Sequence, residues 1–129
     1  MFKSGLYYVG DLCYVLHNEW DEVCELTIKD RTLLNGEFTL KDGRKFALHS
    51  TKFGDGAYFD QTGNEYGVDA GSIGCILAKD IDLGEPNNYV NGGHFIQFEE
   101  DFETSGDDGL IQIGFIEIDT GDNYEESYA

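Results

Sequence analysis

Glycine residues divide the middle of the chain, residues 53–78, into short segments, and this division most constrains the fold. Six glycines separate runs of aromatic and β-branched residues in the segment FGDGAYFDQTGNEYGVDAGSIGCILA. Such a pattern is typical of β-strands joined by tight turns. Residues 60–64, DQTGN, suit a hairpin loop in which Gly63 takes a positive φ. Residues 73–78, IGCILA, are apolar on both faces, as expected of a central strand.

The flanking sequence predicts further strands and one helix. Asp42-Gly43 between two alternating runs indicates a hairpin over residues 36–50. An apolar stripe at i, i+3, i+4 and i+7 predicts a helix near residues 19–28, with Asn18 as its N-cap. This stripe consists of Trp20, Val23, Cys24 and Thr27. Further strands are expected at residues 6–9, 12–16, 94–99 and 110–118, the last two paired with each other across a polar loop, residues 101–109.

The pattern as a whole predicts a mainly β protein with a minor α+β component. We expect an antiparallel β-sandwich or a partly open barrel of eight to nine short strands with one short helix. The chain of 129 residues is long enough for one core, so residues 1–119 are predicted to form a single domain. Residues 120–129 have no pattern and are predicted to be a flexible acidic tail.

Charge is distributed very unevenly along the chain. The protein has 26 Asp and Glu against eight Lys and Arg, a formal net charge of −18. All eight bases lie in residues 1–79, whereas residues 80–129 hold fourteen acids and no Lys or Arg. We therefore expect no direct binding to nucleic acid or to anionic membranes, because both need a basic surface. A basic protein partner and a bound cation remain options, and so does an acidity that only increases solubility.

The sequence also indicates where the protein works. It contains no run of 18 apolar residues and no signal-peptide pattern at the start. Its three cysteines are an odd number at unremarkable spacing, which suits reduced thiols. These features predict a cytoplasmic protein that neither spans a membrane nor is secreted.

A few residues are candidates for chemistry. Asp60 and Asp69 lie on the arms of the predicted hairpin and could act as general acid and base if one carboxyl were in an apolar pocket. Turn formation through local backbone amides is the simpler interpretation. Cys13 could be a nucleophile if a histidine lay beside it, but its place between Leu12 and Tyr14 favours a buried structural thiol.

Aromatic residues and metal ligands supply the remaining candidates. Tyr7, Tyr14, Tyr58 and His94 could line a ligand pocket, whereas His49 is expected at an exposed sheet edge. The set Cys13, His17 and Cys24 lacks the paired spacing of a zinc site, and the acids of residues 101–108 lack EF-hand spacing. Neither a metal site nor a cofactor is predicted.

Two segments resemble proteins of uncharacterised families. The opening GLYYVGDLCYVL, residues 5–16, resembles small bacterial and bacteriophage proteins that begin with a G-D-P-C-Y-type segment, although Leu12 replaces the proline. Residues 54–71 are similar to the closing G-D-G-x-Y hairpin of a family of unknown function. The resemblance implies a bacterial or bacteriophage protein of the cytoplasm and carries no activity with it.

Two hypotheses about function follow. The first is a non-enzymatic accessory or interaction protein that presents its acidic second half to a basic partner. The alternative is a small hydrolase or ligand-binding barrel with a pocket lined by tyrosine and aspartate. We favour the first because no catalytic spacing is recognisable. Exposed sheet edges also allow a homo-oligomer, since proteins tend to cover such edges.

Overall fold

The computed structural model describes residues 1–81 and 92–121. In this part of the chain it contains twelve β-strands in four antiparallel sheets, one α-helix and three short 3₁₀ helices. The mainly β fold class is therefore confirmed. The strand count exceeds the predicted eight to nine because very short strands, and one strand without apolar residues, left no signal in the sequence. None of the helices in the described residues is long and apolar enough to cross a membrane.

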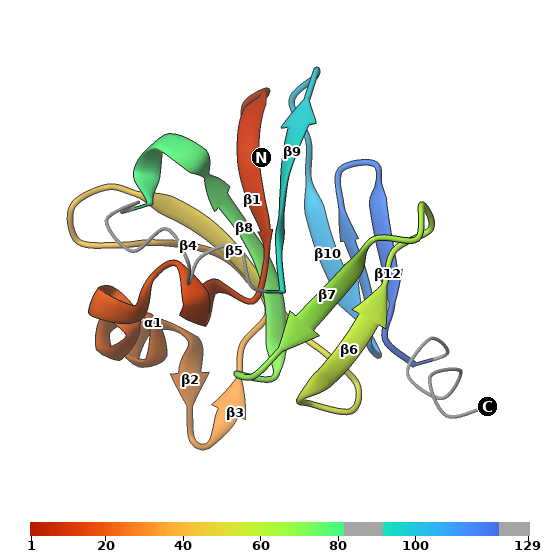
Figure 1. Ribbon diagram of the computed structural model, residues 1–129. Coiled ribbons are helices and arrows are strands. Elements are labelled where there is room, and N and C mark those ends of the chain that lie inside the picture. Colours follow the sequence, from red (N-terminus) through yellow and green to blue (C-terminus); the bar gives the residue numbers. More distant parts are fainter. Residues whose placement is uncertain (82–91, 122–129) are drawn as a thin grey trace.

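A five-stranded sheet forms the centre of the molecule, with the strand order β4-β5-β8-β1-β9 (Figure 1). Its strands are β1 (Gly5–Gly10), β4 (Gly36–Thr39), β5 (Lys45–Ser50), β8 (Ser72–Leu77) and β9 (His94–Phe98). The central strand β8 is buried from Ser72 to Ile76, as its continuous apolar sequence predicted. Gly74 allows β5 to approach closely, because a Cβ at this position would collide with the carbonyl oxygen of Ala47.

One face of this sheet is covered by the only α-helix of the described residues, α1 (Trp20–Thr27). The predicted helix and its stripe are confirmed, since Val23 and Thr27 are buried and Trp20 packs against the same core. The predicted cap is wrong: Asn18 lies in the 3₁₀ helix η2 (His17–Glu19), and Glu19 precedes α1 without a side-chain cap. After α1 comes a small hairpin of β2 (Ile28–Lys29) and β3 (Thr32–Leu33).

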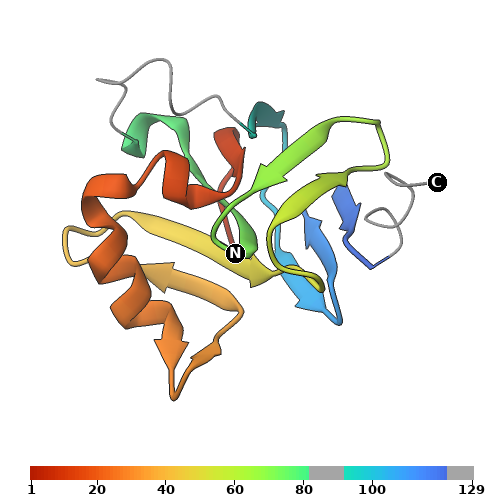
Figure 2. The ribbon, with the colours of Figure 1, turned by 60° about the horizontal axis from the view of Figure 1, so that its bottom comes forward.

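The opposite face is covered by two smaller sheets (Figure 2). One is the hairpin of β6 (Gly56–Phe59) and β7 (Glu65–Val68), and the other contains β10 (Thr104–Asp107), β11 (Leu110–Ile113) and β12 (Ile116–Asp119). Side chains alternate between the two faces, so that Tyr7 of β1 enters the core under these sheets while Tyr8 enters the core under α1. The arrangement is layered, and the described strands form no closed barrel.

The hairpin predictions hold in detail. Strand β4 pairs with β5 across a turn in which Gly43 has φ +98°, and β6 pairs with β7 across a turn in which Gly63 has φ +92°. Both turns use glycine in the left-handed region, where a Cβ is unfavourable. Local turn chemistry therefore identified both hairpins correctly.

Three strand predictions are wrong. Residues 12–16 begin as the 3₁₀ helix η1 (Leu12–Tyr14), because the Asp11 carboxylate binds the amide of Cys13 and turns the chain. Residues 110–118 form two strands, since Gly114 adopts φ +57° and reverses the chain. The supposed loop over residues 101–109 contains β10, which pairs with β11, while β9 pairs with β1.

The predicted acidic tail begins later than the sequence indicated. Thr120, placed in the tail by the sequence, is fully buried, and its Oγ1 accepts a hydrogen bond from the amide of Lys52 at 2.9 Å. Residues 122–129 of the predicted tail lie outside the described residues, and so do residues 82–91, most of the segment before β9.

Candidate functional site

Asp60 is a turn residue in this structure. Its side chain is buried and accepts hydrogen bonds from the amides of Thr62 and Asn64 at 2.8 and 3.1 Å and from the hydroxyls of Thr62 and Tyr66 at 2.6 and 2.7 Å. Burial opposes ionisation of Asp60, but these hydrogen bonds outweigh it and lower the pKa of the carboxyl below its ordinary value. A general acid needs the opposite shift, so the geometry matches the turn interpretation.

Asp69, Tyr14 and Cys13 do come together, around the buried carboxylate of Asp11, which the Gly10-Asp11 sequence predicts only as a turn residue that binds local backbone amides. Asp11 accepts hydrogen bonds from the amides of Cys13 at 3.0 Å and of Asp69 and Ala70 at 2.7 Å each. The hydroxyl of Tyr14 donates to the side chain of Asp69. The cluster therefore ties the end of β1 to the loop between β7 and β8, which is a structural role.

The thiol of Cys13 has surroundings that oppose a nucleophile. Burial raises its pKa well above the ordinary value, and the neighbouring carboxylate of Asp11 raises it further. The thiol consequently stays protonated at neutral pH, whereas a nucleophilic cysteine must become a thiolate. All three cysteines of the chain are free, and Cys75 is buried in the core.

The remaining predicted residues do not converge. Tyr7 and Tyr58 are buried in the core beneath the smaller sheets, and their hydroxyls donate to the carbonyls of Lys3 and Gly54 at 2.7 and 2.9 Å. Tyr14 packs against the core on the other face of the central sheet. His94 lies at the start of β9, with its Nε2 2.7 Å from the carbonyl oxygen of Glu65. The acidic hollow described below includes none of these side chains in its lining.

His49 was expected at an exposed edge, and this prediction is wrong. Its side chain is only 2% exposed, because β10 packs over that face of β5. Nε2 lies 2.9 Å from Oγ1 of Thr104, while Nδ1 has no hydrogen-bond partner among residues 1–81 and 92–121. Burial lowers the pKa of His49 to about 4, so the ring is neutral at physiological pH.

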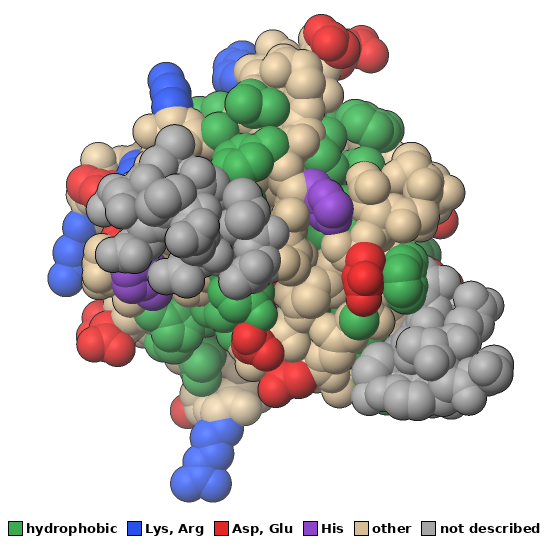
Figure 3. Space-filling model, in the orientation of Figure 1, with side chains coloured by type: hydrophobic (Ala, Val, Ile, Leu, Met, Phe, Trp, Pro, Cys, Tyr) green, Lys and Arg blue, Asp and Glu red, His purple; other side chains and the backbone are tan. Residues whose placement is uncertain are grey.

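A hollow of about 740 Å³ lies where β9 leads into β10. It is lined by residues 97–105 together with Gln112, Gly114 and Phe115, and we call it the acidic hollow. Acidic side chains project from the molecule at this end, with hydrophobic side chains beside them (Figure 3). Its volume is within the range of pockets that bind small molecules or short peptide segments.

The floor of the acidic hollow is aromatic. The rings of Phe98 and Phe102 are stacked with centroids 4.1 Å apart, and Phe115 leans against Phe98 at 5.3 Å. Phe98 and Phe102 are buried, whereas Phe115 is 57% exposed. The described part of the hollow thus combines a packed aromatic base with one ring that reaches solvent.

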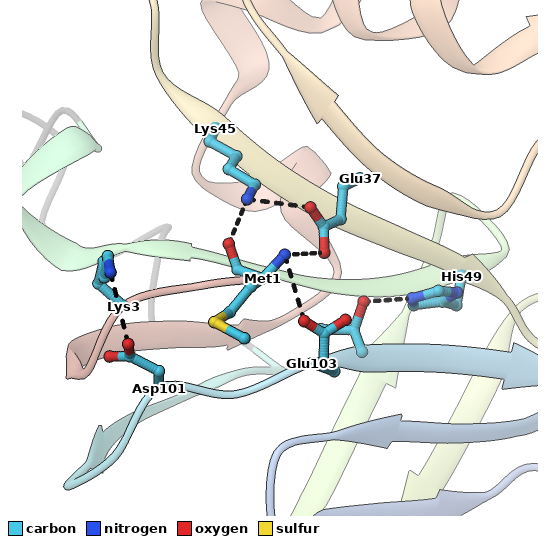
Figure 4. Close-up of polar contacts among 8 residues, drawn as sticks. Met1, Lys3, Glu37, Lys45, His49, Asp101 and Glu103 are labelled. Atoms are coloured by element: carbon cyan, nitrogen blue, oxygen red, sulfur yellow. Dashed lines mark hydrogen bonds and ion pairs between the residues drawn. The ribbon is translucent and has the colours of Figure 1, made fainter.

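Four carboxylates form the rim. Glu99, Glu100, Asp101 and Glu103 are all exposed residues that line the hollow. The segment before β1 forms ion pairs with two of them. The ammonium group of Lys3 lies 3.5 Å from Asp101, and the ammonium group of Met1 lies 3.4 Å from Glu103 (Figure 4). Within residues 1–81 and 92–121, no cation pairs with Glu99 or Glu100.

The segment before β1 also orients the rim. Phe2 and Phe102 exchange backbone hydrogen bonds of 2.8 and 2.9 Å, and the amide of Ser4 donates to the Asp101 carboxylate at 2.9 Å. This last hydrogen bond lowers the pKa of Asp101, and nearby Lys3 lowers it further. The rim is therefore negatively charged, and hydrogen bonds from the segment before β1 hold its backbone in place.

This arrangement attracts cations. Carboxylates attract positive charge directly, and an aromatic ring attracts it through the negative face of its π system. Across the described residues, no group of three His, Cys, Asp or Glu side chains is arranged to hold a metal ion. The sequence could have suggested the acids, since they cluster at residues 99–103. It could not suggest the aromatic floor, because Phe115 joins Phe98 only through tertiary packing.

Comparisons of this chain with protein-family models, with curated proteins and with solved structures find no match.

Proposed function

We propose that this protein is a non-enzymatic interaction protein and that the acidic hollow is the surface it presents to a basic protein partner. The observation that carries the proposal is the combination, in one hollow, of an exposed aromatic ring with Glu99 and Glu100, which pair with no cation in the described part of the chain. The proposal places the partner's positive charge at Glu99 and Glu100, which no cation of residues 1–81 and 92–121 neutralises.

The overall charge supports the same proposal. A formal net charge of −18 attracts a basic partner over long distances and raises the rate of encounter, especially at low ionic strength. The hollow then supplies what net charge lacks, which is apolar contact for the aliphatic part of a basic side chain. The affinity for the partner then comes from electrostatic attraction and from apolar contact, so only part of it is lost when salt screens the charges.

The enzymatic alternative receives less support from the geometry. The pKa of Cys13 is raised and that of Asp60 is lowered, which are the wrong directions for a nucleophile and a general acid. Tyr7 and Tyr58 are closed inside a core. We therefore favour binding over catalysis. Three free cysteines suit the reducing cytoplasm as the place of this interaction.

A binding experiment with matched charge variants tests the proposal. A fluorescently labelled basic peptide with alternating lysine and serine is titrated with the protein, and fluorescence anisotropy gives the affinity. We expect Glu99→Gln/Glu100→Gln to weaken binding about three- to tenfold at low salt, because exposed ion pairs contribute up to about 1 kcal/mol each. The variant Glu25→Gln/Glu65→Gln changes net charge equally at two exposed residues outside the hollow and should change affinity less than about twofold.

Two results would contradict the proposal. Equal weakening by both double variants would mean that net charge alone attracts the peptide and that the hollow has no role. Binding of an acidic peptide of the same length with similar affinity would mean that charge is not recognised at all.

A further inference from the structure

We infer that the acidic hollow selects arginine over lysine, by stacking the guanidinium group of an extended basic segment of the partner on Phe115 between Glu99 and Glu100. This inference rests on the proposed function and deepens it, because it names the side chain that the hollow recognises. It follows from four features of the hollow: the fixed position of Phe115, the aromatic series behind it, a similar arrangement already occupied within the protein, and the exposure of the ring.

Phe115 is held in place from both sides of its backbone. Its carbonyl oxygen accepts a hydrogen bond of 2.5 Å from the side-chain amide of Gln61, and the amide of the preceding Gly114 donates to the carbonyl of Glu103 at 3.0 Å. The ring itself leans on Phe98 with an interplanar angle of 54°. A ring that is already fixed loses little conformational entropy when a ligand stacks on it.

Phe115 ends a continuous series of aromatic rings. Phe2 stacks on Phe102 at 5.4 Å, Phe102 stacks on Phe98 at 4.1 Å, and Phe98 contacts Phe115 at 5.3 Å. Gly114 leaves space for this contact, because a Cβ there would lie 2.7 Å from the ring of Phe98. The exposed ring is therefore supported by packed neighbours and cannot collapse into the core.

The inner end of the series already holds a cation. Nζ of Lys45 lies 4.4 Å from the ring centroid of Phe2 and 2.9 Å from a carboxylate oxygen of Glu37. The outer end has the same two attractive components, an aromatic ring and carboxylates, in Phe115 with Glu99 and Glu100. The outer end thus offers the same two kinds of attraction that hold Lys45 at the inner end, which points to a positively charged side chain as the occupant.

Exposure of Phe115 decides between the two basic side chains. A cation above a ring that is 57% exposed remains partly hydrated. The ammonium group of lysine is strongly hydrated, whereas the planar guanidinium group is weakly hydrated, stacks on aromatic faces and donates two hydrogen bonds to a single carboxylate. Arginine therefore gains more than lysine at this site. The volume of about 740 Å³ leaves room for the neighbouring residues of the segment.

The test compares two labelled peptides of equal length and charge, one with alternating arginine and serine and the other with alternating lysine and serine. We expect the arginine peptide to bind about three- to tenfold more tightly, because the planar guanidinium group stacks on the ring and donates two hydrogen bonds to one carboxylate, whereas an ammonium group does neither. Phe115→Ala should remove most of this preference. Phe115→Leu keeps an apolar side chain without a π face and should lose the preference as well.

A control variant separates stacking from general apolar contact. Ile28 is 45% exposed and lies beside α1, so Ile28→Ala removes exposed apolar surface outside the hollow and should keep the preference for arginine. Circular dichroism and thermal unfolding establish that each variant is folded as the wild type is.

The possible failures are distinguishable. Equal affinity for the two peptides, with both still weakened by Glu99→Gln/Glu100→Gln, would overturn this inference and leave the proposed function intact. A preference for arginine that survives Phe115→Ala would also overturn it. Binding that does not depend on Glu99 and Glu100 would remove the proposed function itself. Dimerisation of the protein that is lost in Phe115→Ala, without any binding of the arginine peptide, would assign the hollow to a second copy of this chain and overturn the inference.

Discussion

Two groups of acidic side chains in this protein have opposite surroundings. Asp11 and Asp60 are buried, and each carboxylate accepts three or more hydrogen bonds from nearby amides and hydroxyls. Glu99 and Glu100 are exposed at the rim of the acidic hollow and pair with no cation in the described residues. The same chemical group therefore occurs in two roles.

The difference teaches which acids build the fold and which are available to a ligand. A buried carboxylate is tolerated only when hydrogen bonds replace the water it has lost. Its oxygens then bind groups of the fold and are not available to a ligand. An exposed carboxylate keeps its hydration and costs the fold little. Removing the first kind should therefore reduce stability, and removing the second kind should reduce binding.

The largest expected effect on stability is at Asp11. Asp11→Ala leaves the amides of Cys13, Asp69 and Ala70 without their acceptor, which should lower the free energy of unfolding by about 3–5 kcal/mol. Chemical denaturation measures this change. Because that variant can fail to fold, Asp11→Asn provides a second measurement: it retains one acceptor oxygen and should lose about half as much. A loss below about 1 kcal/mol for Asp11→Ala would break the comparison.

His49 is a buried polar group that is only partly satisfied, and it should make stability depend on pH. Its pKa falls from 6.5 to about 4 in the folded protein, so the unfolded chain binds the proton first as the pH decreases. The contribution of neutral His49 to the free energy of unfolding is complete above about pH 6.5 and declines toward pH 4. The free energy of unfolding is already about 2 kcal/mol lower at pH 5. Unfolding curves measured between pH 5 and pH 7 follow this loss.

A non-titrating variant isolates the histidine from other groups. His49→Gln keeps a side chain able to bond Thr104 and should have a flatter pH profile between pH 6.5 and 5 than the wild type. Parallel profiles for the two proteins would mean that His49 titrates normally and is not shielded by β10.

The smallest expected effect on stability is at the rim. Glu99→Gln/Glu100→Gln should leave the free energy of unfolding within about 0.5 kcal/mol of the wild type, or raise it slightly, because like charges are removed from an exposed surface. The same variant is expected to weaken peptide binding. A large destabilisation would mean that Glu99 and Glu100 are structural groups like Asp11 and Asp60. It would then count against the proposed binding function.

Much of the fold was predictable from local signals. Asp42-Gly43 and the loop around Gly63 identified two hairpins, and the stripe through Val23 and Thr27 identified the helix. Each of these signals depends on residues close together in the chain. Strand β10 was missed because TSGD has no apolar alternation, and it is a strand only because β11 supplies its hydrogen-bond partners.

The candidate site was less predictable than the fold. The predicted residues Asp60 and Asp69 are turn and loop residues, and Tyr7 and Tyr58 are core residues. Of the acids at 99–103, Glu99 was assigned to a predicted strand, and Asp101 and Glu103 were weighed only as metal ligands in a polar loop. Sequence shows neither which carboxylates lack a cation nor which ring lines the same hollow. His49 illustrates the same limit: its burial depends on a strand that is 55 residues away in the sequence.

By itself, the sequence determined the β class, the helix, the glycine turns and the concentration of negative charge after residue 79, because side-chain period, backbone freedom at glycine and net charge are all local or additive properties. Tertiary structure alone decided that β9 pairs with β1, that Asp11 is buried, and that Phe115 lies against Phe98 beside Glu99 and Glu100. These outcomes depend on which distant segments bury their apolar faces together, and no neighbouring residue carries that information.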